Sequence, residues 1–324
     1  MFNLIPTMTR SLKSKTPLHS SYDRLGLVLN HLGASRSHTR SYTSVSIGAK
    51  FSTKYKNYAL NESNKVISYF HDIPLNLDVE NGTATMVVEV PRWSNAKFEI
   101  DTKATGNPIV QDVKKGQVRF VRNLFPYNGY IHNYGALPQT WEDPTQKSGS
   151  EDLYGDGDPL DVCEIGSAIL KTGQVTTVKI LGSLALVDDG ELDWKIIVIN
   201  TQDPLAKNLS DIEDVSVHCP GLLDATRQWF RDYKLADGKA KNVFALGGQY
   251  RNQKETIETI FECRAAWDKL VTGKSEASGF AIDNITLKGT PKNVESFSFN
   301  EEVLASKPEA DTEIPADIFR SFYF

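Results

Sequence analysis

The stretch Ile180-Leu181-Gly182-Ser183-Leu184-Ala185-Leu186-Val187 is almost wholly apolar. Such a run suits a strand that is buried on both faces, because a strand with one face in water alternates apolar and polar residues. It therefore predicts a closed or doubly covered sheet.

Further predicted strands flank this run on both sides. They are rich in β-branched and aromatic residues and are separated by turn residues. They cover residues 85–90, 97–101, 118–122, 160–165, 175–187 and 194–200. Apolar residues at helical spacing appear only later, in residues 220–234 and 254–271, where they are typical of core packing. The pattern predicts an α+β, mainly β fold: one small β-barrel flanked by helices.

Length and charge narrow the class of protein. The chain has 324 residues, 40% of them hydrophobic, which is ample for a sizeable core. No apolar run approaches the roughly 20 residues of a membrane-spanning helix, so we expect no transmembrane segment. Residues 1–45 hold six basic side chains and one acidic one, a net charge of +5. Because the whole chain carries a net charge of −5, the remaining residues carry −10. An acidic body argues against a nucleic-acid partner.

The first 45 residues differ from the rest in composition. They are rich in Ser, Thr and Arg, with short apolar pieces between the basic residues. This is typical of an organellar transit peptide, for a mitochondrion rather than a plastid, although an ordinary disordered extension is the alternative. We expect a single domain over residues 46–324. The three cysteines, Cys163, Cys219 and Cys263, form no C-x-x-C pair, which indicates buried thiols in a reducing compartment.

An acidic motif, Gly155-Asp156-Gly157-Asp158-Pro159-Leu160-Asp161-Val162, lies in a predicted turn that leads into a strand. Clustered carboxylates repel one another, and Mg²⁺, which prefers oxygen ligands, is a natural neutraliser. A calcium loop of the EF-hand type fits poorly, because its sixth and twelfth positions would hold Asp161 and Ser167 rather than Gly and Glu. A solvated acidic turn remains the alternative to a metal site.

A second acidic stretch and a set of cations complete the pattern. Asp193 and Lys195 share one face of a predicted strand that follows the turn at residues 188–191. A phosphate site needs cations and hydroxyls that converge opposite a metal cluster, although a single lysine on a strand usually faces water. The candidates are Arg92, Lys97, Arg119, Arg122, Lys195, Lys234, Tyr130, Tyr134 and Tyr233. No phosphate-binding loop of the G-x-x-x-x-G-K-[ST] type is present.

Together these motifs resemble a known family. The acidic motif stands in register with Val88-Glu89-Val90-Pro91-Arg92-Trp93-Ser94-Asn95-Ala96-Lys97-Phe98-Glu99, Arg119-Phe120-Val121-Arg122-Asn123, Gly129-Tyr130-Ile131-His132-Asn133-Tyr134-Gly135, Asp193-Trp194-Lys195 and Trp229-Phe230-Arg231-Asp232-Tyr233-Lys234. From residue 47 onward the chain resembles the soluble, magnesium-dependent inorganic pyrophosphatases of the eukaryotic, fungal-type branch. Its N-terminal extension resembles that of the mitochondrial members.

The resemblance implies a fold, an activity and a set of roles. It implies a five-stranded OB-type barrel and hydrolysis of pyrophosphate to two phosphates, which drives pyrophosphate-producing biosynthesis forward. Several Mg²⁺ ions would be held by Asp156, Asp161, Asp193, Asp188 and Glu99. Asp158 would accept a proton from a water that bridges two metals. The phosphoryl groups would be bound by Lys97, Arg119, Tyr134, Lys195, Tyr233 and Lys234, of which Lys97, Arg119 and Tyr134 also count as catalytic. Glu89 and Tyr130 would support the site.

The resemblance also bears on partners. Tyr127-Asn128 stands where relatives often carry histidines, near the family's subunit contact, and we expect a homodimer and a matrix-side mitochondrial location. Two other functions stay open at this point. A barrel that binds single-stranded nucleic acid would need a basic groove with stacking aromatics, which an acidic body does not favour. A scaffold for a protein partner would not need the full set of site residues.

Overall fold

The apolar run at residues 180–187 lies in β14 (Val175–Asp188), which pairs with four other strands. The computed structural model describes residues 42–148 and 152–323, so residues 1–41 of the expected transit peptide lie outside the described residues, whereas residues 43–45 belong to β1 (Thr43–Ile47). All the pairings of β14 are antiparallel, to β15 (Glu191–Asn200), β4 (Thr83–Val90), β16 (Val243–Phe244) and β17 (Arg251–Asn252). β14 is therefore the strand that links most of the other strands of the larger sheet.

The larger sheet contains a ring of pairings. Its order is β15-β13-β10-β4-β14-β16, with β13 at Asp161–Glu164 and β10 at Asn133–Ala136. β15 pairs with β13 in parallel and also with β14, so the hydrogen-bonded pairings return to the strand where they began. Gly135 permits the close approach of β10 to β4, because a Cβ there would lie 2.0 Å from the Val87 carbonyl oxygen.

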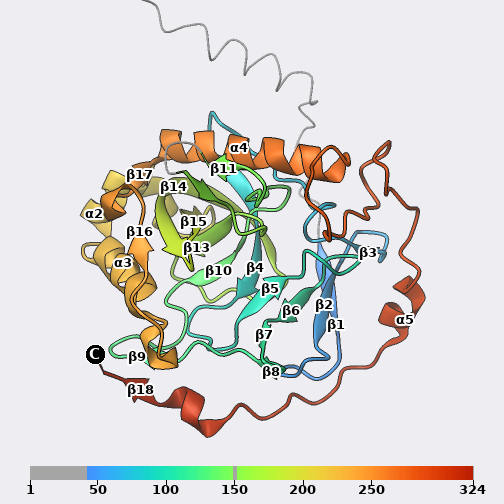
Figure 1. Cartoon of the computed structure of the whole chain (residues 1–324), viewed down its shortest axis with the longest axis horizontal. Coiled ribbons are helices and arrows are strands. Elements are labelled where there is room, and N and C mark those ends of the chain that lie inside the picture. Colours follow the sequence, from blue (N-terminus) through green and yellow to red (C-terminus); the bar gives the residue numbers. More distant parts are fainter. Residues whose placement is uncertain (1–41, 149–151, 324) are drawn as a thin grey trace, which may run out of the picture. The chain divides into compact units, whose positions relative to one another are not determined.

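Shorter strands surround this sheet (Figure 1). A second sheet has the order β1-β2-β6-β5, with β3 paired to β2. Its strands are β1 (Thr43–Ile47), β2 (Lys56–Leu60), β3 (Val66–Ile67), β5 (Phe98–Ile100) and β6 (Ile109–Gln111). Two-residue pairs are formed by β7 (Val113–Lys114) with β8 (Gln117–Val118), β11 (Lys147–Ser148) with β12 (Leu153–Tyr154), and β9 (Asn123–Leu124) with β18 (Ser321–Phe322).

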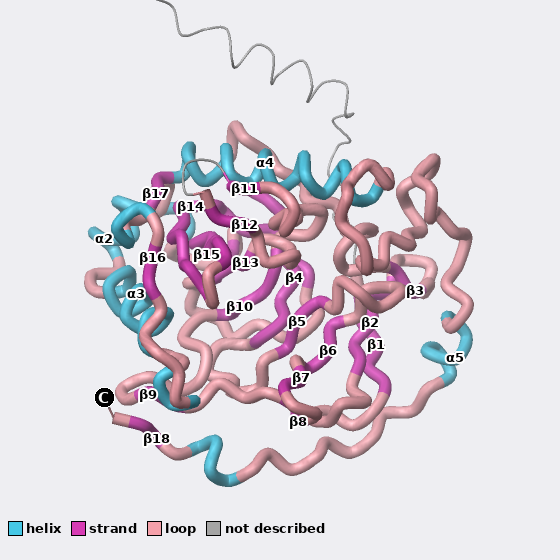
Figure 2. Tube along the Cα trace, in the orientation of Figure 1, coloured by secondary structure: helices cyan, strands magenta, loops and turns pink. Residues whose placement is uncertain are grey.

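The helices lie at the periphery of the strands (Figure 2). The α-helices are α2 (Ile212–His218), α3 (Leu222–Asp232), α4 (Gln253–Val271) and α5 (Asn300–Ala305). The 3-10 turns are η1 (Ala206–Asn208), η2 (Leu235–Asp237), η3 (Leu246–Gly248) and η4 (Ala316–Phe319). Asn252 and Glu255 form a capping box that starts α4. Among the described residues, no helix has both the length and the apolar character that a bilayer span needs.

Both faces of β14 and β15 are buried, as the apolar run predicts. Ile197 and Ile199 pack in one apolar cluster with Trp229 of α3, whereas Ile196 and Val198 pack in another with Ile257 of α4. A strand's side chains alternate between its faces, so each strand serves two cores. The prediction of a mainly β fold with flanking helices is confirmed.

Some expected elements differ from the structure. The predicted strand at residues 118–122 is mostly irregular: β8 ends at Val118, and Phe120 makes only an isolated bridge to Ala96. Of the cysteines, only Cys163 is fully buried, and Cys219 and Cys263 are half-buried.

Candidate active site

A small cleft of about 110 Å³ brings most of the predicted site residues together. Among its described lining residues seven are acids, namely Glu89, Glu99, Asp156, Asp158, Asp161, Asp188 and Asp193. Lys97, Lys195, Tyr130, Tyr134 and Tyr233 line it as well. The cleft therefore combines a high density of carboxylates with cations and phenols.

The turn that carries Asp156 and Asp158 is held by the segment before it. Gly157 has φ +89°, a left-handed conformation that favours glycine. Its carbonyl oxygen accepts a hydrogen bond from Trp141 Nε1 at 3.0 Å, and its backbone N–H donates to the Glu142 carbonyl oxygen at 2.9 Å. The Asp158 N–H donates to Asp156 Oδ1 at 2.9 Å. These contacts fix both carboxylates at the cleft.

The strand register places the next group of residues. The parallel pairing of β13 and β15 sets Asp161 opposite Lys195. Lys195 Nζ lies 2.5 Å from Asp161 Oδ2 and 3.0 Å from the Tyr134 hydroxyl, and it also donates to Asp193. The Tyr134 hydroxyl donates to Asp161. Lys195 is 2% exposed, so this lysine is buried among its partners.

A second group gathers around Asp112, which sequence reasoning did not single out. Lys97 Nζ lies 2.6 Å from Glu99 Oε2 and 3.0 Å from Asp112 Oδ2, and Arg119 pairs with the same Asp112 oxygen. Arg119 itself does not line the cleft, but it reaches Lys97 through Asp112. Asp112 thereby aligns two of the predicted phosphate-binding cations.

The third group joins the β14–β15 turn to the end of α3. Lys234, which follows α3, pairs with Asp188 at the end of β14. Lys234 is 5% exposed and lies beside the cleft lining rather than in it. The Tyr233 hydroxyl lies 3.5 Å from Asp188 Oδ2, and the Tyr233 ring stacks on Trp229 with centroids 5.0 Å apart. The packing of Tyr233, the C-cap residue of α3, against Trp229 of the same helix therefore positions Tyr233 in the cleft.

Glu89 and Tyr130 also line the cleft. Glu89 Oε1 accepts a hydrogen bond from the Ile100 N–H at 2.7 Å. The Tyr130 ring contacts the rings of Tyr134 and Trp229 at centroid distances of 5.2 and 5.3 Å. Their positions fit the supporting role that the resemblance implies.

Burial and mutual repulsion raise the pKa values of Asp156, Asp158 and Asp193. Burial, and then the neighbouring carboxylates, raise the pKa of Asp156 to about 8 and that of Asp158 to about 7. Burial likewise raises the pKa of Asp193, although Lys195 opposes the shift. Asp112 behaves differently, because Lys97 and Arg119 outweigh its burial and lower its pKa. An external cation beside Asp156 and Asp158 would remove this penalty.

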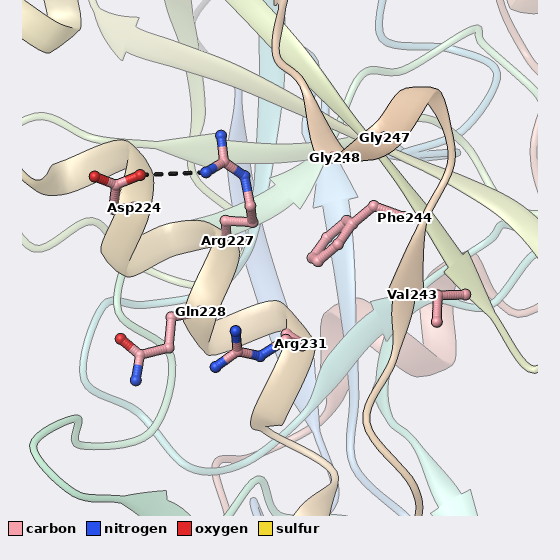
Figure 3. Close-up of a pocket in the computed structure, with 8 residues that line it drawn as sticks. All are labelled: Asp224, Arg227, Gln228, Arg231, Val243, Phe244, Gly247 and Gly248. Atoms are coloured by element: carbon pink, nitrogen blue, oxygen red, sulfur yellow. Dashed lines mark hydrogen bonds and ion pairs between the residues drawn. The ribbon is translucent and has the colours of Figure 1, made fainter.

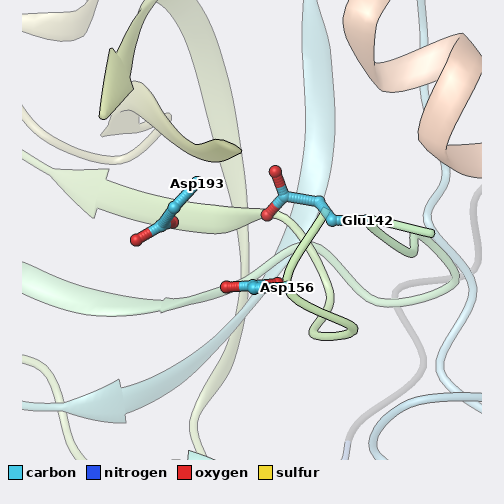
Figure 4. Close-up of side chains that lie close together, drawn as sticks. All are labelled: Glu142, Asp156 and Asp193. Carbon is cyan, nitrogen blue, oxygen red and sulfur yellow. The ribbon is translucent and has the colours of Figure 1, made fainter. Parts of the chain in front are cut away.

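Glu142 adds a further carboxylate to the acidic group. One carboxylate oxygen each of Glu142, Asp156 and Asp193 lie within 4.8 Å of one another (Figure 4). Glu142 is 4% exposed; its Oε1 accepts from the Trp194 N–H at 3.1 Å, and its Oε2 has no hydrogen-bond partner among the described residues. A buried oxygen without a partner is costly unless a cation or its water uses it. The donor set therefore fits a metal ion with oxygen ligands.

Sequence reasoning missed both Glu142 and Asp112, since neither belongs to a spaced motif. Of the candidate cations, Arg92 and Arg122 do not line the cleft. A wider hollow of about 640 Å³ lies between α3 and the β16–η3 segment (Figure 3). Its arginines, Arg227 and Arg231, are already paired with Asp224 and Asp232, and it holds none of the predicted site residues.

Fold and site together define a class: a mainly β protein whose cleft joins a carboxylate cluster able to hold a metal ion to cations and phenols able to bind an anion. The sequence profile described as "Inorganic pyrophosphatase" matches residues 86–268. The chain belongs to the inorganic pyrophosphatase family.

Similar proteins cover nearly the whole chain. The inorganic pyrophosphatase of Kluyveromyces lactis is 52% identical over 84% of this chain and 92% of its own length. The mitochondrial inorganic pyrophosphatase of Saccharomyces cerevisiae is 45% identical over 94% of this chain and 95% of its own. The solved structure of the Schistosoma japonicum inorganic pyrophosphatase has a TM-score of 0.82 at 41% identity, covering 87% of this chain and all of that one.

Proposed function

We propose that this enzyme hydrolyses inorganic pyrophosphate to two phosphates, with Asp158 as the proton acceptor. Family membership supports the reaction, and one observation carries the assignment of the site: the acidic turn, Lys195 and Tyr134 line the same small cleft. Its volume of about 110 Å³ suits a compact, highly charged substrate. Removing a product of biosynthetic reactions in this way drives those reactions forward.

The acidic residues are proposed to hold Mg²⁺ ions. The first would be held by Asp156, Asp161 and Asp193, with Asp161 shared by a second, and those that arrive with pyrophosphate by Asp188 and Asp193, with Glu99 acting partly through water. Bound magnesium supplies positive charge and lowers the pKa of a coordinated water. Support comes from the proximity of Asp156 and Asp193 to Glu142, whose Oε2 lacks a hydrogen-bond partner among the described residues.

Asp158 then takes a proton from the attacking water. The water oxygen bonds to one phosphorus, and the bond from that phosphorus to the bridging oxygen breaks, so that two phosphates leave. Charge on the departing phosphate is neutralised by Lys97, Arg119, Tyr134, Lys195, Tyr233 and Lys234. Burial and the neighbouring carboxylates raise the pKa of Asp158 to about 7 in the metal-free protein. Bound cations would lower this pKa and keep the carboxylate ionised, which is the form that can accept a proton.

The decisive test is phosphate release from pyrophosphate by the full chain, with Mg²⁺ and with a chelator. Asp158→Asn should lose about 10²–10⁴-fold in rate at saturating Mg²⁺, because the proton acceptor is gone. Asp152→Asn is the control, since Asp152 pairs with Lys147 at the surface, 79% exposed. Near-normal turnover of Asp158→Asn would refute the assigned base. No release by folded wild-type protein would favour the scaffold function.

We also propose the finer architecture that the resemblance implies. The ring of pairings among β4, β10, β13, β14 and β15 would be the five-stranded OB-type barrel. An experimental structure in which β15 pairs with only one of β13 and β14 would contradict this.

A homodimer is proposed as the working assembly. The indole of Trp93 is 55% exposed, and its backbone N–H donates to the Tyr130 carbonyl oxygen at 2.7 Å, next to the Tyr127-Asn128 segment. Sedimentation of wild type and Trp93→Ser would test it: a monomeric wild type contradicts the proposal.

The location is proposed to be the mitochondrial matrix. A relative named as mitochondrial aligns with 94% of this chain, and residues 1–45 have the composition of a transit peptide. Import of the full chain, but not of a chain without residues 1–45, into isolated mitochondria is the expected result.

A further inference from the structure

The last described residues, 316–323, lie against the segment that follows Arg119, and we name them the C-terminal strap. Its strand β18 pairs in parallel with β9, setting Ser321 opposite Asn123 and Phe322 opposite Leu124. The Phe125 N–H donates to the Phe322 carbonyl oxygen at 2.9 Å. Figure 1 shows β18 beside β9, with the preceding chain running along the outside of the molecule. The strap lies beyond residues 86–268, the part that the family profile matches.

Arg122 joins the strap to η2, the 3-10 turn that follows α3. Its Nη1 lies 3.0 Å from Asp317 Oδ2, and its guanidinium carbon lies 5.5 Å from the centre of the Phe322 ring. Its Nε lies 3.7 Å from Asp237 Oδ1, three residues beyond Lys234. Arg122 thus connects three segments, two of which carry predicted phosphate-binding residues.

Asn123 carries the same connection inward. It is 5% exposed, and its Nδ2 donates to the Phe319 carbonyl oxygen of the strap at 3.2 Å. Its Oδ1 accepts from Asn95 Nδ2 at 2.8 Å and from the Gly129 N–H at 2.9 Å. Asn95 precedes Lys97 by two residues, and Gly129 precedes Tyr130. A continuous hydrogen-bonded path therefore leads from the strap to two segments of the cleft.

Arg119, at the start of the segment that leads to Asn123, is also held by hydrogen bonds of its backbone. Its carbonyl oxygen accepts from the Lys97 N–H at 3.2 Å and from Gln111 Nε2 at 2.8 Å. The Val121 N–H donates to the Asn95 carbonyl oxygen at 2.6 Å. Residues 119–122 belong to no strand, so no regular sheet ladder fixes them before β9 begins at Asn123. The strap supplies the restraint at the far end of this short segment.

We propose that the C-terminal strap is a positioning element for pyrophosphate binding, acting through Arg122 and Asn123 on Arg119 and Lys97. The inference rests on the proposed function, because the affected property is the grip on pyrophosphate. A single partly exposed ion pair such as Arg122–Asp317 contributes little on its own. The β18–β9 pairing and the buried Asn123 contact add to it, and small displacements of binding groups have large effects on rate.

The test compares the full chain with a form that lacks residues 316–324 and with Asp317→Asn. The deletion should lower kcat/KM for pyrophosphate about tenfold, and Asp317→Asn about two- to threefold. The affinity for methylenediphosphonate, an analogue whose bridging carbon cannot be hydrolysed, should fall in parallel. Asp152→Asn, which breaks the exposed pair to Lys147, should leave both quantities unchanged. Should the deletion fail to fold, Asp317→Asn and Arg122→Met carry the test.

A double-mutant cycle separates positioning from general stability. In an Arg119→Met background, Asp317→Asn should weaken analogue binding clearly less than in wild type, since one of the two groups that the strap positions is absent and only Lys97 remains. Equal effects in both backgrounds would overturn the proposal, as would a fall in Tm with unchanged analogue affinity. Analogue binding also distinguishes the two hypotheses. If wild type binds the analogue but releases no phosphate from pyrophosphate, the proposed reaction fails while the positioning role is still measured.

Discussion

Two regions meet at the cleft: the turn that carries Asp156 and Asp158, and the cluster of Lys97, Asp112 and Arg119, of which Lys97 lines the cleft. They differ in how their carboxylates are compensated. Neither Asp156 nor Asp158 forms a salt bridge among the described residues, and the pKa of each is raised. Asp112 pairs with two cations, and its pKa is lowered. The first region is a group of carboxylates that added cations would neutralise, whereas in the second region the Asp112 carboxylate already pairs with two cations of the protein.

The largest expected effect breaks the first region. Asp156→Asn should raise the Mg²⁺ concentration for half-maximal activity by about 100-fold or more, because a proposed ligand is lost. Magnesium titrations of phosphate release measure this. An unchanged magnesium requirement would remove Asp156 from the metal site.

The same substitution should stabilise the metal-free protein. The folded-state pKa of Asp156, about 8, lies above the ordinary value, so its contribution favours folding at low pH and is lost as the pH rises through 8. A neutral Asn escapes this loss. We expect Tm without metal to rise by about 2–4 °C at pH 8, equivalent to about 1 kcal/mol, and not at pH 4. A lower Tm at pH 8 would contradict the repulsion described for this turn.

The next effect breaks the second region. Asp112→Asn should lower kcat/KM for pyrophosphate by about 30-fold, since Lys97 and Arg119 lose the charged partner that aligns them. The magnesium requirement should stay near that of wild type. A change in magnesium affinity as large as that of Asp156→Asn would show that the two regions are not separable.

Glu142→Gln tests whether Glu142 acts together with the carboxylates of the first region. The amide keeps an acceptor for the Trp194 N–H but removes the charge near Asp156 and Asp193. We expect magnesium affinity to fall about tenfold, with kcat at saturating Mg²⁺ within about threefold of wild type. A magnesium requirement equal to that of wild type would assign Glu142 to the fold alone.

The smallest effect concerns Glu89, another residue that lines the cleft. Because Glu89 is buried and accepts from the Ile100 N–H, Glu89→Gln should leave Tm within about 1 °C, whereas Glu89→Ala should lose about 1–3 kcal/mol of folding free energy. Calorimetry of both variants is the measurement. Equal losses in the two would mean that the hydrogen bond is unimportant.

Periodicity was sufficient for the long elements. β14, β15, α3 and α4 fall within a few residues of their predicted ranges. Each carries an apolar pattern that is long enough to identify the element, over several turns in a helix or many residues in a strand. Short elements were missed: α2 has seven residues and depends on a capping box and tertiary packing. The segment at 118–122 looked like a strand, but its backbone N–H and C=O groups bond to Asp112, Asn95 and Lys97 instead of a ladder.

The site followed the same division. The acidic motif and the Asp193-Trp194-Lys195 strand could be predicted, because their chemistry is compressed into a few adjacent residues. Glu142 and Asp112 could not, because each lies outside the regular strands and helices and approaches the cleft-lining residues by a path that depends on the fold. The convergence of Lys97 and Arg119 on one oxygen of Asp112 is likewise a property of three-dimensional arrangement.

The double pairing of β15 has a consequence for how the chain folds. β15 meets β14 through a turn of adjacent residues, but it meets β13 only after a separation of some thirty residues, and β4 is still more distant. Pairings of this kind carry high contact order and form slowly. Tyr134, Asp161 and Lys195 come from three strands of this ring, so their side chains meet only once it has closed. Recovery of activity during refolding should therefore lag behind formation of the β14–β15 hairpin, which makes enzymatic activity a late reporter of the folding reaction.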